Sequence, residues 1–218
     1  MIYLDYAATN PFTKYPCSKY GTFLNPNANY AYKEQKLLDE CANRVKASIG
    51  AKSGNVVFGG TSSQLIENLM NAIDDKIIDY RIITSGSVQY TIYRFSHSRL
   101  FELREIELAL RDANDNFIFP FICWQGVNNI TGEIFPIEQI GEICHEFNSF
   151  FICDMTAIIG KAPLPANLDQ WCDCAIWSGH KLGTELGIGA MWLSDKFNNW
   201  LPSFPLFRLC ELSQHRMP

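Results

Sequence analysis

Hydrophobic residues in this chain follow two patterns: short unbroken runs, and longer stretches in which they recur every three or four residues. The unbroken runs have the length of β-strands and are bounded by residues that favour turns. They predict strands at residues 55–58, 81–85, 117–124, 150–153, 174–177 and 187–193. Because an unbroken apolar strand must be covered on both faces, these runs predict a buried sheet.

The stretches between the runs predict helices. Residues 34–49 form an amphipathic pattern whose apolar stripe comprises Leu37, Leu38, Cys41, Val45 and Ile49. Residues 64–73 and 136–147 predict two further helices, and a helix or loop follows the strand at 81–85 as far as Tyr93. Strands that alternate with helices predict an α/β fold, with a mostly parallel sheet sandwiched by helices.

Length and charge narrow the classes of function. A chain of 218 residues is long enough for one large domain with a substantial core. Its net charge of −5, without a cluster of Lys and Arg, argues against a nucleic-acid partner. No apolar stretch approaches the roughly 18 residues that a membrane-spanning helix needs. We therefore expect neither a nucleic-acid nor a membrane partner.

The amino terminus and the cysteines predict a cytoplasmic protein. Residues 1–5 lack the basic segment and apolar stretch of a signal peptide. The eight cysteines fall mostly within apolar runs, which predicts reduced core thiols and not a disulfide framework. Cys172 and Cys174 alternate about Asp173 in an apparent strand, so they are expected on one face. No second Cys or His pair has zinc-site spacing, and we predict no metal site.

A carboxylate and a lysine close two of the predicted strands. Asp154 follows the run at 150–153, and Ser178-Gly179-His180-Lys181 follows the run at 174–177. A carboxylate can keep a pyridine nitrogen protonated, and a lysine can form a Schiff base with an aldehyde. Pyridoxal 5'-phosphate requires these two protein groups. The alternative is structural, because Asp and Lys commonly close strands in α/β proteins.

The turn at 59–63, Gly-Gly-Thr-Ser-Ser, provides a third feature. A strand, a turn of small residues and a helix start place backbone N–H groups and hydroxyls where a phosphate can bind. By itself the turn is weak evidence, since Gly and Ser mark any tight strand-to-helix connection. Its place before the Asp and the Lys agrees with a pyridoxal phosphate site.

Several of these segments, in this order, resemble the cysteine desulfurases of the class V aminotransferase family, which are fold-type I pyridoxal phosphate enzymes. The similarity extends over nearly the whole chain to about Leu193. Its landmarks are residues 3–11 (Tyr-Leu-Asp-Tyr-Ala-Ala-Thr-Asn-Pro), 25–26 (Asn-Pro), 127–136, Asp154, 160–161 (Gly-Lys), 178–181 and 187–190 (Gly-Ile-Gly-Ala). The resemblance implies the large domain of a pyridoxal phosphate-dependent transferase.

The resemblance also implies a role for each site residue. Lys181 would hold the cofactor as a Schiff base and later move protons at the substrate carbon. Asp154 would pair with the pyridinium nitrogen, and Asn129 would lie near the phenolic oxygen of the ring. The phosphate would be bound by Ser178 and His180, with help from Ser62 and Ser63. Without the other motifs, His180 would be read as a structural histidine beside a surface lysine.

The chain departs from the family pattern at five places. Gln89 stands where the family has the histidine that stacks on the ring, and Gln has no proton chemistry near neutral pH. Ala157 replaces the glutamine that bonds the phenolic oxygen, and Ile130 replaces an acidic residue. Residues 61–64 and 183–186 differ from the family's phosphate turn and from its Tyr-Gly-Pro-Lys segment. These changes weaken the expected site but keep its lysine.

Family members are about twice this long. We therefore expect a cofactor-binding large domain at 1–199 and an aromatic tail at 200–218, without the small domain that carries the sulfur-accepting cysteine and the substrate-binding arginine. Cys210 lies in an apolar run and does not match that cysteine. Apolar surface near Trp192, Trp200, Phe204 and Phe207 is expected to need cover, which predicts a homodimer or a partner chain.

Three hypotheses follow. The chain is a pyridoxal phosphate-dependent enzyme of desulfurase or related C–S lyase type that acts on a cysteine-like amino acid, alone or completed by a partner chain. Alternatively, it binds the cofactor without turnover, as a binding or interaction module. The third hypothesis is a truncated pseudoenzyme that keeps the fold and binds the cofactor poorly. The intact Asp154, Ser178, His180 and Lys181 favour the first two.

Overall fold

A seven-stranded sheet forms the centre of the molecule in the computed structural model, which describes residues 32–100, 102–184 and 186–201. The strands are β1 Asn55–Gly59, β2 Tyr80–Ser85, β3 Ser98–Leu100, β4 Phe119–Gln125, β5 Phe150–Asp154, β6 Cys174–Ser178 and β7 Gly189–Leu193. The helices are α1 Tyr32–Ser48, α2 Ser62–Lys76, α3 Tyr90–Tyr93, α4 Arg104–Asp115, α5 Ile137–Glu146 and α6 Asp195–Trp200. Single turns of 3-10 helix, η2 Leu168–Gln170 and η3 Gly179–Leu182, complete the described elements.

The strands are ordered β1-β7-β6-β5-β4-β2-β3. Strand β7 runs antiparallel to both of its neighbours, and the other pairs are parallel. The carboxyl ends of β2, β4, β5 and β6 therefore meet at one edge of the sheet. In open α/β sheets this edge is where ligands bind.

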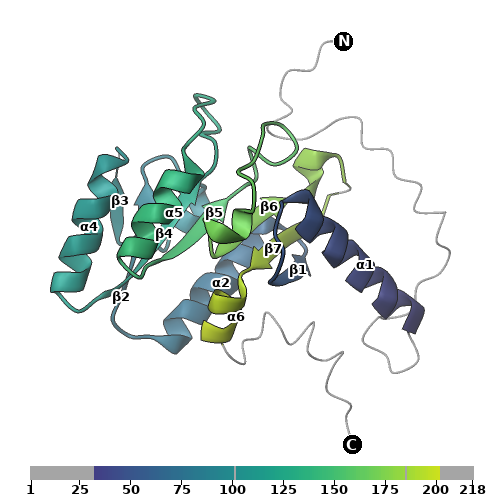
Figure 1. The fold of residues 1–218 in the computed structure, drawn as a ribbon, viewed down its shortest axis with the longest axis horizontal. Helices are drawn as coiled ribbons and strands as arrows, with labels where there is room; N and C mark the ends of the chain where they lie inside the picture. The colour runs from purple at the N-terminus through teal and green to yellow at the C-terminus, as the bar shows by residue number, and fades with distance from the viewer. Residues whose placement is uncertain (1–31, 101, 185, 202–218) are drawn as a thin grey trace, which may run out of the picture.

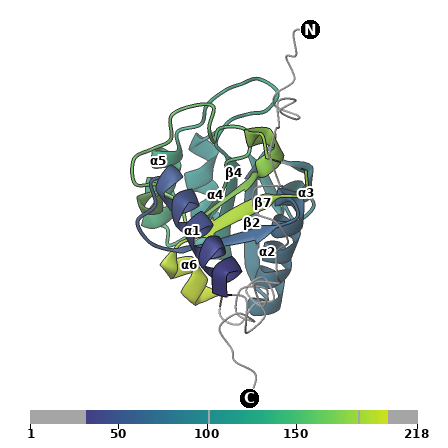
Figure 2. The ribbon, with the colours of Figure 1, turned by 90° about the vertical axis from the view of Figure 1, so that its right-hand side faces the viewer.

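Helices cover both faces of the sheet, as predicted. One buried cluster joins the sheet to α4, α5 and the end of α1, and the other joins it to α2, α3 and α6. Figure 1 shows α1 at the β1 end of the sheet and α4 at the β3 end. Figure 2 shows α5 on one side of the strands and α2 with α3 on the other. The prediction of a mostly parallel sheet between helical layers is confirmed.

Most of the predicted elements are present, with boundaries shifted by a few residues. Three elements, β3, α4 and α6, were not predicted from the sequence. The prediction that Phe117 lies in a buried strand was wrong, because this side chain is 94% exposed, its φ is 58°, and β4 begins two residues later. The apolar run at 117–124 thus overstates the strand at its amino end.

Helix α1 follows its predicted stripe only at its carboxyl end. Ile49, just beyond the helix, is buried, and Val45 packs against the α4/α5 cluster. Cys41 is exposed, and Leu38 is 36% exposed. The helix therefore contacts the rest of the described chain at one end, as its position at the side of the sheet in Figure 1 shows.

Local hydrogen bonds explain where α2 begins. The Thr61 side chain caps the helix by accepting a bond from the Gln64 N–H at 3.0 Å. Gln64 Oε1 in turn accepts a bond from the Gly60 N–H at 2.9 Å. This pair of bonds resembles a capping box, in which a Ser or Thr and a Gln three residues later satisfy helix-start N–H groups. The turn at 59–64 therefore fixes the first turn of α2.

Cys172 and Cys174 lie in different core clusters, because β6 begins only at Cys174. The expectation that both thiols share one face was therefore wrong. Asp173, between them, is a structural carboxylate: it accepts bonds from the Phe151 N–H at 3.0 Å and from the Ser194 hydroxyl at 3.3 Å. It ties β5 to the start of α6.

Among the described residues, none of the helices has the length and apolar character that crossing a bilayer requires.

Gly141 tests the packing of α5. A Cβ at this position would lie 2.2 Å from the backbone oxygen of Trp171, so the helix contacts the chain before β6 without space for a side chain. We expect Gly141→Ala to lower the free energy of unfolding by about 1–3 kcal/mol through overpacking. In an open helix the same change would stabilise by up to about 1 kcal/mol. Urea unfolding measures the sign, with the neighbouring Glu142→Ala as control. An unchanged or raised midpoint for Gly141→Ala would contradict this packing.

Candidate active site at the carboxyl edge of the sheet

Asp154 is the last residue of β5 and lies at the carboxyl edge, buried to 8% exposure. It pairs in register with Gln125 of β4 and Ile176 of β6. One of its carboxylate oxygens accepts a bond from the Thr156 N–H at 2.9 Å. Burial raises the pKa of Asp154, while the bonds from Thr156 and the charge of Lys181 act against that rise.

The turn after β6 presents His180 and Lys181. Both residues lie on η3, the single helical turn that follows the buried Ser178. The turn is closely packed at Gly179, where a Cβ would lie 2.4 Å from the Thr184 hydroxyl and 3.1 Å from the Ile188 carbonyl oxygen. The Gly179 N–H donates to the carbonyl of Ile188 at 2.8 Å. These contacts hold the turn, and with it the two side chains, against the start of β7.

The start of α2 meets the end of β6 at the same edge. The hydroxyl oxygens of Ser62 and Ser178 are 2.6 Å apart and hydrogen-bonded, and both side chains are buried. Ser63, the next residue of α2, accepts a bond from Gln89 Nε2 at 2.9 Å. A helix start with unpaired backbone N–H groups and hydroxyls is suited to an anion. The structure thus brings together Ser62, Ser63, Gln89 and Ser178.

Gln89 has one end of its amide without a partner. Its Nε2 bonds Ser63, but Oε1 is buried and lacks a hydrogen-bond partner among the described residues. Gln89 precedes α3 and has no side-chain bond to that helix. A buried acceptor left unpaired costs about 1–3 kcal/mol. A hydrogen-bond donor at this point would satisfy the Gln89 oxygen.

A cluster next to Asp154 was not predicted from the sequence. The Ser87 hydroxyl accepts bonds from Gln125 Nε2 at 2.7 Å and from Asn128 Nδ2 at 3.3 Å. Asn128 Oδ1 accepts bonds from the N–H groups of Ile130 and Thr131, which fixes the direction of its amide. Gln125 is the end of β4 beside Asp154. A polar residue at the carboxyl end of a buried strand indicates a site at this edge, and Gln125, the last residue of β4, could have been chosen from the sequence on that ground.

The structure distinguishes the two asparagines of the 127–132 segment. Asn128 is buried and belongs to the Ser87 cluster, whereas Asn129, the residue chosen from the sequence, is exposed. Ile130 is 83% exposed in the same turn. Ala157 lies half-buried in the segment after Asp154. Neither replacement introduces a new polar group at this edge.

The described cysteines are poorly suited to nucleophilic chemistry. Five of the six are buried, and Cys41 on α1 is exposed. Burial raises the pKa of Cys123, Cys153 and Cys174 well above the usual range of a thiol. Thiolates, not thiols, are nucleophiles, so these three side chains are inert at neutral pH. Within the described residues, no group of three or more His, Cys, Asp and Glu could hold a metal ion.

The earliest sequence landmarks, residues 3–11 and 25–26, lie outside the described residues, as do Cys210, Phe204 and Phe207. The expectation of exposed apolar surface at Trp192 was wrong, because this side chain is fully buried and its Nε1 donates to the Ser53 carbonyl at 2.9 Å. Trp200 is half-buried against the aromatic cluster of Phe119, Phe121 and Phe150.

Comparison with known proteins gives one family. The profile of the aminotransferase class-V family matches residues 2–206. The chain is 25% identical over 221 residues to the cysteine desulfurase IscS of Rickettsia felis, which covers 89% of the chain and 52% of that relative. It is 26% identical over 221 residues to a mitosomal cysteine desulfurase of Trachipleistophora hominis, covering 88% of the chain and 48% of the relative. The chain thus spans about half the length of the curated relatives it matches.

The fold has a clear match among solved structures. The X-ray structure of a NifS-like protein from Rickettsia africae superposes with a TM-score of 0.75 at 23% identity, and the match covers 91% of this chain and 59% of that one. This likeness shows the fold: a mostly parallel mixed sheet flanked by helices, as in that NifS-like protein.

The raised pKa of Asp154 gives a stability test on the ligand-free protein. The folded state holds the Asp154 proton more tightly than the unfolded state, in which the pKa is near 3.8. Stability from this group is therefore greatest at low pH and falls as pH rises through the folded pKa. We expect Asp154→Asn to be more stable than wild type at neutral pH and to lose this advantage on acidification.

Urea unfolding at several pH values measures that difference, with exposed Glu142→Gln as the matched control. Equal stability of Asp154→Asn and wild type across the pH range would show that the carboxylate is not held in a disfavoured, buried position.

Proposed function

The chain belongs to the class-V aminotransferase family, and from this premise we propose that it binds pyridoxal 5'-phosphate through Lys181 and acts on a cysteine-like amino acid in a desulfurase-type C–S lyase reaction. The observation that carries the proposal is the meeting of a buried carboxylate, a lysine and a serine-lined helix start at one edge of the sheet. The relatives named as cysteine desulfurases support the reaction type.

The residues present fit this cofactor at its ring nitrogen. Asp154 is a buried carboxylate without a salt bridge to any residue in the described ranges. Removing a carboxylate from water disfavours its charged form, and this burial raises the pKa of Asp154 although Thr156 and the charge of Lys181 partly offset it. A pyridinium N–H would supply both a hydrogen-bond donor and a positive charge. The cofactor would thereby relieve the cost that Asp154 imposes on the ligand-free protein.

The residues also fit a phosphate. Ser62 and Ser178 place two hydroxyls 2.6 Å apart at the start of α2. Gly189 lies so close to this turn that a Cβ there would be 2.8 Å from the Ser62 nitrogen. In the proposed site Ser62, Ser63 and the backbone at the start of α2 would bind the phosphate together with Ser178 and His180. Charge-assisted bonds of this kind are about twice as strong as neutral ones.

The face of the ring would be bounded by residues that follow β2 and β4. Gln89 offers a buried Oε1 that needs a donor, and the Ser87 hydroxyl already accepts two amide N–H groups. The resemblance assigns Asn129 to the phenolic oxygen, whereas it is the neighbouring Asn128 that lies in the buried Ser87 cluster. Both are retained as candidates, with Asn128 favoured by its burial.

When bound, the cofactor supplies an electron sink for a carbanion at the substrate α-carbon. The chain supplies the remaining functions. Lys181 holds the cofactor's aldehyde and moves a proton at the α-carbon, Asp154 keeps the ring nitrogen protonated, and the serines anchor the phosphate. Lys161 lies within electrostatic reach of Lys181, and burial together with that charge lowers its pKa.

A second candidate function is cofactor binding without turnover. Gln89 and Ala157 lack the acid–base and ring-oxygen groups expected in an active desulfurase, so this chain has fewer groups to move the protons of a C–S cleavage. Completion by a partner chain or a homodimer, and location in the cytoplasm, are part of the proposal. The SepCysS–SepCysE complex, whose structure shares the fold, is an example of a relative with a partner.

The first test is the visible absorption spectrum of the purified protein with pyridoxal phosphate. We expect a band that borohydride removes, that is absent from Lys181→Ala, and that persists in the control Lys161→Ala. Adding cysteine together with a dithiol reductant then separates the two functions: formation of alanine, with the sulfur reduced to sulfide by the dithiol, supports desulfuration, and a stable band without these products supports binding alone. A band that survives in Lys181→Ala would refute the assignment of this lysine.

The phosphate assignment predicts an affinity change. Removing a hydrogen bond to a charged group costs about 1.5–3 kcal/mol, which corresponds to a roughly tenfold to hundredfold weaker Kd. We expect this loss for Ser62→Ala and for Ser178→Ala in fluorescence titrations with pyridoxal phosphate. Titration with pyridoxal, which lacks the phosphate, should not distinguish either variant from wild type. Exposed Ser48→Ala serves as control. Equal affinity for pyridoxal phosphate in wild type and all three variants would contradict the proposed site.

A further inference from the structure

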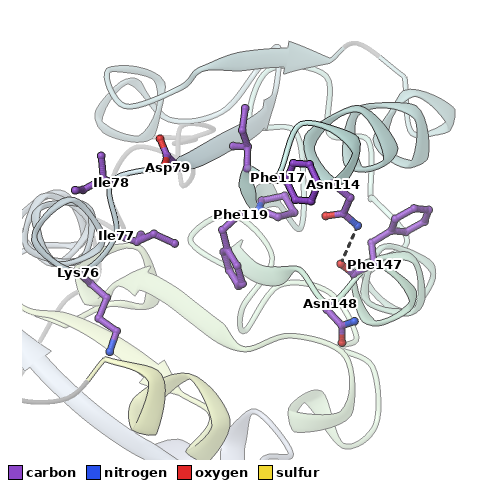
Figure 3. Close-up of a pocket in the computed structure, with 11 residues that line it drawn as sticks. Lys76, Ile77, Ile78, Asp79, Asn114, Phe117, Phe119, Phe147 and Asn148 are labelled. Carbon is purple, nitrogen blue, oxygen red and sulfur yellow. Dashed lines mark hydrogen bonds between the residues drawn. The ribbon is translucent and has the colours of Figure 1, made fainter.

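The edge of the sheet opposite the candidate active site carries an open, largely apolar pocket of about 700 Å³. It lies where β2 and β4 begin, and Figure 3 shows its walls. Ile77, Ile78, Phe117, Phe119 and Phe147 line it, and Lys76 stands at its rim. Large apolar side chains of the described chain therefore surround an open space at the edge of the sheet opposite the candidate active site.

Two of these side chains are almost fully exposed. Ile78 and Phe117 are each 94% exposed, and Phe117 has a φ of 58°. Bulky residues rarely adopt this left-handed conformation because it is sterically strained. In the described chain this conformation ends helix α4, where the Ile118 N–H donates to the Ala113 carbonyl at 2.9 Å, but the Phe117 ring itself stays exposed. A segment that packs on Phe117 would provide the missing burial.

The chain itself passes this pocket. Trp200, the last residue of α6, stacks on Phe119 with ring centroids 5.8 Å apart and planes at 16°. Lys76 Nζ lies 5.4 Å from the centroid of the same Trp200 ring. Both Phe119 and Lys76 also line the pocket. The described chain thus reaches Leu201 one residue after a ring that contacts the pocket lining.

The segment that follows has the composition to fill the pocket. Residues 202–209 read Pro-Ser-Phe-Pro-Leu-Phe-Arg-Leu. Two prolines within four residues disfavour a helix and favour the extended polyproline II conformation. That conformation has three residues per turn, so Phe204 and Phe207 share one face. Extended, proline-containing segments bind grooves lined by aromatic side chains.

We propose that residues 202–209 of this same chain dock in the pocket at the amino edge of the sheet, with Phe204 and Phe207 against Phe117 and Phe119. Each residue of such a segment advances about 3.1 Å, so the two phenylalanines come within the first turns after the rim. The docked segment covers Ile78 and Phe117 and accounts for a large aromatic side chain at the helix end. This role is independent of the proposed chemistry, which lies at the other edge.

A double-mutant cycle on the full chain tests the contact. Phe117→Asn removes the aromatic ring but suits a positive φ, since Asn adopts this conformation readily. The tail variant carries Phe204→Ser and Phe207→Ser. We expect each variant alone to raise the unfolding equilibrium constant about fivefold in urea, as loss of a partly buried aromatic contact predicts. The combined variant should be no less stable than the tail variant.

Two results would overturn the contact. If Phe117→Asn is as stable as wild type or more stable, the only effect of the change is relief of strain, and nothing docks on the ring. Losses that add in the combined variant also overturn the contact. Ile130→Asn is the matched control, because Ile130 is 83% exposed at the other edge. It should have the same effect in wild type and in the tail variant.

Sedimentation separates this proposal from docking between copies. With docking inside one chain, the coupling between Phe117 and the tail is independent of protein concentration. A dimer that dissociates in the tail variant, with coupling that grows with concentration, would show that the occupant is a second copy and would overturn docking within the chain.

Discussion

The close approach of β7 to the start of α2 is the constraint on which the candidate site depends. Gly189 pairs with Gly59 of β1 on one side and with Ser178 of β6 on the other. A Cβ at Gly189 would lie 2.6 Å from the carbonyl carbon of Thr61, so only glycine allows this contact. Because the strand can come so near, the Ser178 hydroxyl reaches Ser62 across a sequence separation of more than a hundred residues. The contact between the two serines, on which the candidate site depends, is therefore a product of strand order and one missing side chain.

Two buried aspartates show the difference between structure and function at this sheet. Burial raises the pKa of both Asp154 and Asp173. The cost of burying Asp173 is partly offset by hydrogen bonds from a backbone N–H and a hydroxyl of two different elements. Its role in joining β5 to α6 therefore explains why it is buried. The described hydrogen bonds of Asp154 come from Thr156, two residues along the chain. A carboxylate that organises nothing distant, yet is kept buried beside a lysine-bearing turn, is better explained by a ligand than by the fold.

The sequence predicted the parts of this molecule that depend on burial, and it failed where a residue's neighbours in space decide its role. The strands β4, β5, β6 and β7 are apolar because they are covered on both faces, and their runs identify them directly. Phe117 belongs to such a run but precedes the strand, and hydrophobicity alone cannot locate a strand start. Asn128 and Asn129 are chemically identical, so only the turn that buries one of them separates their roles. Ser87 carried no signal at all, since its importance comes from two amides on β4 and the loop beyond.

Helix α2 connects the two edges of the sheet. It begins at Ser62 in the candidate site and ends at Lys76 on the rim of the opposite pocket. Between these ends Leu65, Ile66, Leu69, Met70 and Ile73 are buried at 1% exposure or less. A helix packed so closely along its length cannot slide without opening cavities in the core, because protein interiors are close-packed. A segment that covers the pocket would therefore stabilise the packing of α2 on the sheet. The positions of the serine hydroxyls, by contrast, are set locally by the Thr61 cap and by the close approach of Gly189.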